Sequence, residues 1–162
     1  MSYIPQMYTV AVTVTAAQIK NLNTTPILLV AGVSGCVLDV KSCFLRYNFN
    51  TTPFGTINAN DCILVINSAT PNDIPNCFGL GEGFGIATGF VDQSQSMGLW
   101  LQPAWSNQVS TDTPVAASST VGTGLYLFQY DIGSGFPAGA NWSTGDGTIT
   151  AILRYSVIKV TA

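Results

Sequence analysis

Hydrophobic and polar residues alternate along much of this chain, and that pattern predicts β-strands. The longest example follows Gly145-Asp146-Gly147, whose Asp-Gly pair tolerates the positive φ of a tight turn. The residues that then share one face at period two are Ile149, Ala151, Leu153, Tyr155 and Val157. We therefore expect residues 148–160 to form a long strand, central or next to central, that closes a sheet.

Similar patterns predict other strands along the chain. Residues 8–14 alternate clearly, and a second clear run lies at 125–132. Shorter apolar runs bounded by Gly, Pro and Asn predict strands at 25–30, 62–66, 84–91 and 98–101, with a weak one at 115–118. Residues 70–85 are dense in Pro, Asn and Gly and predict a loop.

A long β-forming run in the first third of the chain changes parity partway. Leu38 and Val40 lie on positions of one parity, whereas Leu45 and Tyr47 lie on the other. One extra residue near Lys41-Ser42-Cys43, meaning a β-bulge, would bring both pairs to the same face of the sheet. We therefore predict a bulge at this point.

The period becomes helical near residues 15–22. Thr15 can cap a helix, and Gln18 follows three residues later, as in a capping box. Ile19 and Leu22 share one face of such a helix. We expect one or two helical turns here, and no other helix in the chain.

Taken together, about eight short strands with turn residues between them predict an all-β protein. We expect a single-domain antiparallel β-sandwich or jelly roll over residues 1–162, with one short helix near residues 15–22. Residues 1–6, which include Pro5, are expected to form an N-terminal arm. The chain has no internal repeat, which excludes propellers and solenoids.

Composition narrows the class of function. Only 8% of the residues are charged, against roughly 25% in typical soluble domains, so Gly, Ser, Thr and Asn are expected to cover a surface suited to packing against other protein. No apolar run approaches the roughly 20 residues of a spanning helix, and we expect no membrane span. Five scattered Lys and Arg residues on a chain of net charge −3 exclude nucleic acid as a partner.

The sequence lacks the residues that usually carry out catalysis or bind metals. The chain has no His, so the common general base near neutral pH is missing. Asp73 and Glu82 would suit glycoside hydrolysis, but carboxylates that keep a surface loop soluble are the favoured interpretation. No calcium-loop spacing occurs, and the glycines from Gly79 to Gly85 precede a strand rather than the helix of a phosphate-binding loop. We expect no catalytic residues, metal or cofactor.

The spacing of the four cysteines also argues against a metal site. Cys36, Cys43, Cys62 and Cys77 contain no C-x-x-C pair, and no His completes a zinc set. We interpret them as small buried hydrophobic residues in a reducing cytoplasm, with one or two disulfides as the alternative.

Tryptophans supply the candidate contact residues. Trp100 lies inside an apolar run and is expected in the core, whereas Trp105 and Trp142 lie in loops. Exposed indole rings stack on sugars and are enriched at protein interfaces. We therefore take Trp105 and Trp142 as candidate contacts with a protein partner or a carbohydrate.

The two ends of the chain resemble a known family. The stretch Thr15-Ala16-Ala17-Gln18-Ile19-Lys20-Asn21-Leu22-Asn23, then Thr25-Pro26-Ile27-Leu28-Leu29-Val30, is similar to the opening of small jelly-roll virion proteins of tailed bacteriophages. So is the ending, from Gly145-Asp146-Gly147-Thr148-Ile149 to Tyr155-Ser156-Val157-Ile158. Residues 50–124 show no such likeness, and the four cysteines and the glycine-rich stretch at 79–89 depart from the family.

The resemblance implies a function that the residues alone do not give. It implies a non-enzymatic capsid decoration (cement) protein, made in the host cytoplasm, that binds and stabilises the major capsid protein lattice on the outer surface of the virion. It also implies a homo-oligomer, with a trimer favoured. The alternative is a β-sandwich module of a phage tail that recognises a carbohydrate receptor.

Overall fold

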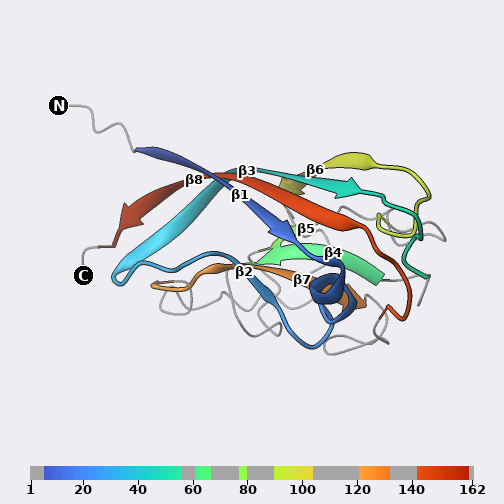
Figure 1. Cartoon of the computed structure of the whole chain (residues 1–162). Helices are drawn as coiled ribbons and strands as arrows, with labels where there is room; N and C mark the ends of the chain where they lie inside the picture. The colour runs from blue at the N-terminus through green and yellow to red at the C-terminus, as the bar shows by residue number, and fades with distance from the viewer. Residues whose placement is uncertain are drawn as a thin grey trace.

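A computed structural model of the chain shows two antiparallel β-sheets that face each other (Figure 1). It describes residues 6–55, 61–66, 77–79, 90–103, 121–131 and 142–160. The expected all-β sandwich is confirmed. Its elements are β1 (Met7–Val14), α1 (Ala16–Lys20), β2 (Ile27–Val30), β3 (Cys36–Asn48), β4 (Asp61–Ile66), β5 (Cys77–Gly79), β6 (Met97–Pro103), β7 (Leu125–Asp131) and β8 (Thr148–Lys159).

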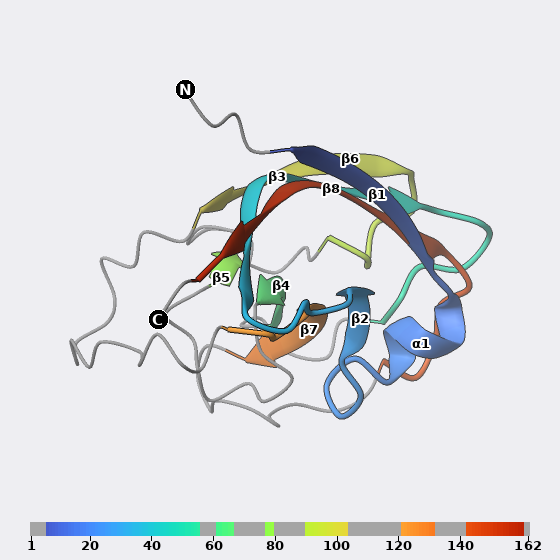
Figure 2. The same cartoon turned by 90° about the vertical axis from the view of Figure 1, so that its left-hand side faces the viewer.

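The strands are paired in a nested order. β1 pairs with β8, β2 with β7, β3 with β6 and β4 with β5, so the first half of the chain is matched in reverse by the second half. Sheet A has the order β1-β8-β3-β6, and sheet B has the order β5-β4-β7-β2. The end of β6 continues into sheet B by pairing with β5. Sheet A arches over sheet B, and α1 lies between their β1 and β2 edges (Figure 2).

β8 takes the expected place near the middle of sheet A, between β1 and β3. Its inward residues Ile149, Ala151 and Leu153 are completely buried, as the alternation predicts. They pack in one hydrophobic core with buried residues of β2, β3, β7 and α1.

The predicted bulge in β3 is confirmed. The register between β3 and β8 shifts between Val40 and Ser42, which leaves Lys41 as the extra residue. Because of this shift, Leu38 on one side and Leu45 and Tyr47 on the other all turn inward and are buried.

The predicted helix cap is also present. The Thr15 hydroxyl accepts a hydrogen bond from the Gln18 backbone N–H, and the Gln18 side chain accepts one from the Thr15 backbone N–H at 2.9 Å. The helix ends at Lys20, earlier than expected. The next backbone N–H groups, of Asn21 and Leu22, bond to the carbonyl oxygens of Gln18 and Ile19, three residues back, and so form a turn. Ile19 and Leu22 still reach the core and are completely buried. Within the described part of the chain, no helix has the length and apolar character needed to cross a membrane.

Some strand boundaries differ from the prediction. β5 lies within the stretch expected to be a loop, since three residues are too few to show a period. The strand expected over 84–91 does not extend to Phe90 and Val91, which form a buried bend. Its earlier part, the strand expected at 115–118 and the arm at residues 1–5 lie outside the described residues.

The Gly145-Asp146-Gly147 motif is more than a turn. The positive φ of 105° is at Gly145, before the aspartate, and not at Gly147. A Cβ at Gly145 would lie 2.4 Å from the Phe54 ring, and one at Gly147 would lie 2.5 Å from the Tyr47 ring. Both glycines are therefore required because the chain passes directly over two buried aromatic rings.

Asp146 ties the start of β8 to the segment that follows β3. Its carboxylate accepts backbone N–H bonds from Thr51 and Thr52 at 3.0 and 2.9 Å, and a bond from the Asn50 amide at 3.0 Å. It also accepts a bond from the Thr51 hydroxyl. These bonds, the Thr51 hydroxyl first, lower the pKa of Asp146 from its usual 3.8 to about 2.

We predict that deletion of Lys41 abolishes cooperative folding, whereas Lys41→Gln costs less than about 1 kcal/mol. The deletion removes the bulge, so one side of β3 must turn over. Either Leu38 moves to the outer face and Asp39 toward the core, or Leu45 moves outward and Arg46 toward the core. Lys41→Gln removes only the exposed ion pair with Asp39. Urea unfolding followed by circular dichroism measures both. A deletion variant with a normal cooperative transition would contradict the role of the bulge.

We predict that Asp146→Asn lowers the thermal unfolding midpoint at pH 7 and flattens its dependence on acid. Because the pKa of Asp146 is lowered in the folded state, its stabilisation is complete above about pH 4 and is lost as the pH falls toward about 2. An amide cannot replace a carboxylate that accepts bonds on both oxygens. Thr51→Val, which removes the first donor, should give an intermediate profile, and an unchanged profile in Asp146→Asn would refute this assignment.

Candidate functional site

Trp142 is a core residue and not the exposed loop residue that the sequence analysis expected. Its side chain is 6% exposed and meets the Phe54 ring edge-on, with the ring centres 6.2 Å apart. Phe54 in turn packs against Tyr47. A loop residue can enter the core when its loop folds back over the sandwich, which local sequence does not reveal. Trp142 is therefore not available for contact, and Trp105 lies outside the described residues.

Trp100, expected in the core, is instead 60% exposed on the outer face of sheet A. The short apolar run around it hides an alternation, because Leu99 and Leu101 pair with the inward residues Leu45 and Cys43 of β3. Trp100 has the opposite parity and must point outward. The exposed tryptophan of the described chain is thus the one that sequence assigned to the interior.

Trp100 ends a row of apolar side chains that crosses all four strands of sheet A. Cross-strand pairing joins Ala11 to Ile152, Ile152 to Phe44, and Phe44 to Trp100. We call these four residues the aromatic row. The rings of Phe44 and Trp100 are 5.0 Å apart and tilted by 52°, a favourable aromatic arrangement. In the sequence the four residues of the row are far apart, and each is only a single outward-facing position on its own strand.

Gly98 on β6 leaves room for the Phe44 ring of the aromatic row. A Cβ at this position would lie 2.4 Å from the tip of the Phe44 ring, so the ring lies directly over the glycine. An aromatic ring that covers a glycine on the neighbouring strand shields its backbone from water. Phe44 is therefore held flat against the sheet, next to Trp100.

Two arginines flank the aromatic row on the same face. Arg46 pairs with Thr150 and Gly98, and Arg154 pairs with Ser42, so each lies one step, about 7 Å along the strand direction, to either side of the row. Both side chains are exposed. Among the described residues, no carboxylate forms an ion pair with either arginine. The site is thus an apolar row with a free cation on each flank.

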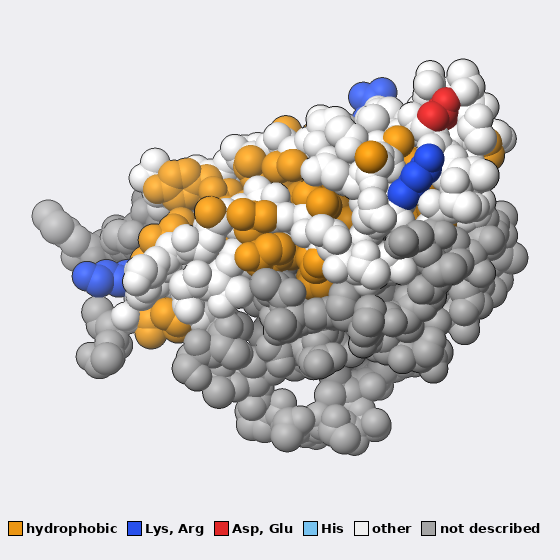
Figure 3. Space-filling view, turned by 60° about the horizontal axis from the view of Figure 1, so that its bottom comes forward, with side chains coloured by type: hydrophobic (Ala, Val, Ile, Leu, Met, Phe, Trp, Pro, Cys, Tyr) orange, Lys and Arg blue, Asp and Glu red, His pale blue; other side chains and the backbone are white. Residues whose placement is uncertain are grey.

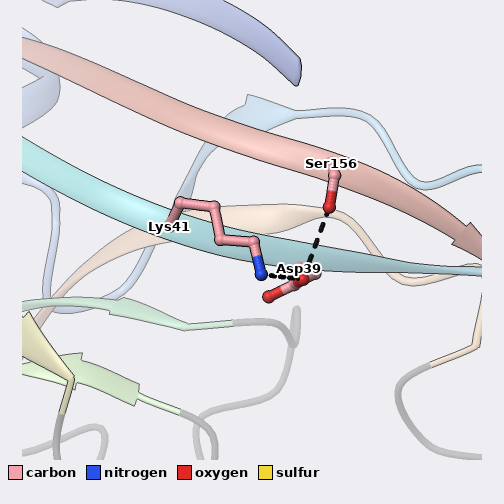
Figure 4. Close-up of polar contacts among 3 residues, drawn as sticks. All are labelled: Asp39, Lys41 and Ser156. Carbon is pink, nitrogen blue, oxygen red and sulfur yellow. Dashed lines mark hydrogen bonds and ion pairs between the residues drawn. The ribbon is translucent and has the colours of Figure 1, made fainter. Parts of the chain in front are cut away.

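A polar cluster of Asp39, Lys41 and Ser156 lies at the bulge (Figure 4). Serine and lysine together raise the question of nucleophilic catalysis. However, the Lys41 ammonium pairs with Asp39, and the Ser156 hydroxyl donates to the same carboxylate at 3.4 Å. Ser156 is also completely buried, so no substrate reaches its hydroxyl. The cluster anchors the bulge and does not provide a nucleophile.

The other candidate groups offer no further site in the described chain. Cys36 and Cys43 are free thiols, and burial raises the pKa of Cys43 to about 12, which keeps it protonated and unreactive. The side chains of Cys62 and Cys77 lie outside the described residues, as do Asp73 and Glu82. No group of His, Cys, Asp and Glu among the described residues is able to hold a metal ion.

Two further exposed hydrophobic residues lie on the edge strands of the two sheets. Tyr8 on β1 and Leu28 on β2 are 38% and 48% exposed, and Tyr8 stacks on Tyr155 at 5.5 Å. A view from below the sandwich shows a broken band of hydrophobic side chains, with few charged ones, over its described part (Figure 3).

Comparisons with known proteins leave the site to be interpreted from its own geometry. No family model, no curated protein and no solved structure matches the chain. The observed features that bear on function are therefore the strand order and the aromatic row.

We predict that Trp142→Ala lowers the free energy of unfolding by about 3–5 kcal/mol, because it leaves a large cavity beside Phe54. Trp100→Ala should cost about 1 kcal/mol or less, since its ring is mostly exposed and loses mainly the contact with Phe44. Urea unfolding measures both values. Equal losses in the two variants would contradict the assignment of one ring to the core and the other to the surface.

Proposed function

We propose that this chain is a structural, non-enzymatic jelly-roll protein of a tailed-bacteriophage virion that decorates the outer surface of the capsid by binding the major capsid protein. The aromatic row is the observation that carries the proposal. It is a ready contact surface, on a chain whose described residues supply no catalytic group.

The strand order supports a jelly roll in particular. A jelly roll arises when one long antiparallel ribbon of four strand pairs is rolled into two sheets. The nested pairs β1–β8, β2–β7, β3–β6 and β4–β5 have this arrangement, with one four-stranded sheet of the order β1-β8-β3-β6. The family that the chain ends resemble is of the jelly-roll type, so the strand order is consistent with that resemblance.

The outer face of sheet A supports a role in assembly. Interface cores are enriched in Trp, Phe and Arg, and those residues contribute most of the binding energy in many complexes. Trp100 and Phe44 with Arg46 and Arg154 form such a set on one flat face. A chain with few charges elsewhere is also suited to close packing in a shell.

The proposal includes self-association into a homotrimer, because the resemblance implies it. β1 pairs only with β8, and β2 only with β7, among the described strands. Free strand edges allow a neighbouring copy to add a strand or to cover the apolar residues beside them. The exposed side chains of Tyr8 and Leu28 lie on these two edge strands.

A carbohydrate-binding module of a phage tail is the second candidate, and the exposed Trp100 favours it. A flat indole with Arg46 diagonally across from it on β3 suits a sugar ring that carries a carboxylate. Glycan-array binding by the wild type that Trp100→Ala abolishes would support this candidate over decoration.

We predict that quantitative mass spectrometry of purified virions finds the chain at a copy number comparable to that of the major capsid protein. A decoration protein occupies repeated sites on the shell, whereas a tail module is present in a handful of copies. Immunogold labelling of intact virions should then mark the capsid and not the tail. Absence from virions, or a copy number typical of a tail, would rule decoration out.

A further inference from the structure

We infer that the outer face of sheet A is a docking surface for an acidic protein partner, one that presents an apolar centre flanked by carboxylates. The inference rests on the proposed function, under which that partner is the capsid shell. It goes further because it names the contact residues and the chemistry of the surface that they meet.

Charge is distributed unevenly between sheet A and the rest of the chain. The strands of sheet A contain four of the five cations, Lys41, Arg46, Arg154 and Lys159, and a single acid, Asp39. Their formal charge is therefore +3 on a chain whose net charge is −3, which leaves −6 for all other residues. A basic sheet on an acidic protein selects an acidic partner.

The arginines are the charges that remain available for a partner. Asp39 and Lys41 neutralise each other at the bulge, and Lys159 lies at the far end of β8. Arg46 and Arg154 lie on opposite flanks of the aromatic row and are exposed. Guanidinium groups bind carboxylates through two parallel hydrogen bonds, which fixes orientation as well as adding attraction.

The aromatic row supplies the apolar centre of the contact. It crosses four strands spaced about 4.8 Å apart, so it extends over about 15 Å. Trp100 is the more exposed of its two aromatic members, and Phe44 is held flat by its contact with Gly98. Rigid aromatic side chains lose little conformational freedom on binding, which favours them as anchors.

A second copy of the chain does not fit this face when it uses the same face. Two copies of sheet A placed face to face would bring four exposed arginines together, Arg46 and Arg154 of each copy, and Asp39, which already pairs with Lys41, is the sole acid in the strands of either sheet. Like charges in contact oppose association. Complementarity therefore favours a partner that is acidic where this face is basic.

The test measures binding of the purified full-length chain to capsid shells from phage that lack it. Bound chain is quantified after co-sedimentation over a range of chain concentrations. We expect Trp100→Ala to weaken binding about tenfold or more. The double variant Arg46→Glu/Arg154→Glu should weaken it about a hundredfold. Wild-type binding should also weaken as NaCl rises from about 50 to about 500 mM.

Matched control variants separate this face from the rest of the surface. Val33→Ser removes an exposed hydrophobic residue from the turn before β3, and Lys20→Glu reverses a charge on α1. Both should bind shells within about twofold of the wild type, because neither residue lies on the outer face of sheet A. Thermal unfolding of each variant confirms that it is folded before binding is compared.

Other outcomes would overturn the inference in distinguishable ways. Wild-type binding to shells that Trp100→Ala and the arginine variant leave unchanged would place the contact elsewhere, with the decoration function intact. A wild type that binds no shells and is absent from virions would remove both proposals. Sedimentation equilibrium that shows an oligomer dissociated by Trp100→Ala would assign the row to contacts between copies of the chain instead.

Discussion

The antiparallel pairing of β3 with β8 is the interaction on which the rest of the structure depends. It extends from Cys36 opposite Lys159 to Asn48 opposite Thr148 and is the longest ladder among the described strands. β1 is added to the free side of β8, and β6 to the free side of β3. The inward residues of β3 and β8 form the side of the hydrophobic core that faces sheet B. Sheet B can therefore pack against them only when β3 and β8 are in register.

Two local features fix this pairing, one inside it and one beyond its end. Inside it, near Val40, the extra residue of the bulge keeps the inner face apolar on both sides of the parity change. Beyond its Asn48–Thr148 end, Asp146 holds the segment after β3 while Gly145 lets the chain pass over Phe54. Because most of the strand pairs join distant parts of the chain, such anchors limit the registers that the strands can adopt, and they offset part of the cost of closing long loops.

How much of this could be read from the sequence depended on whether the deciding contacts were local. The bulge near Lys41 and the Thr15–Gln18 cap follow from residues a few positions apart, and both were predicted. Trp100 and Trp142 were assigned to the wrong environments, since a short apolar run conceals its parity and a loop conceals whether it folds inward. The aromatic row was missed for a related reason, because it exists only once four strands from both ends and the middle of the chain are in register.

Because side chains alternate along a β-strand, the two faces of sheet A are under different constraints. Leu45, Leu153 and their inward neighbours are constrained by packing, where a change of one methylene is felt. Outward positions such as Ile152 and Trp100 share the same backbone but touch little of the core. Substitutions there can redirect the chain to a new partner at little cost to folding, so in evolution the binding specificity of this scaffold is free to change faster than its architecture.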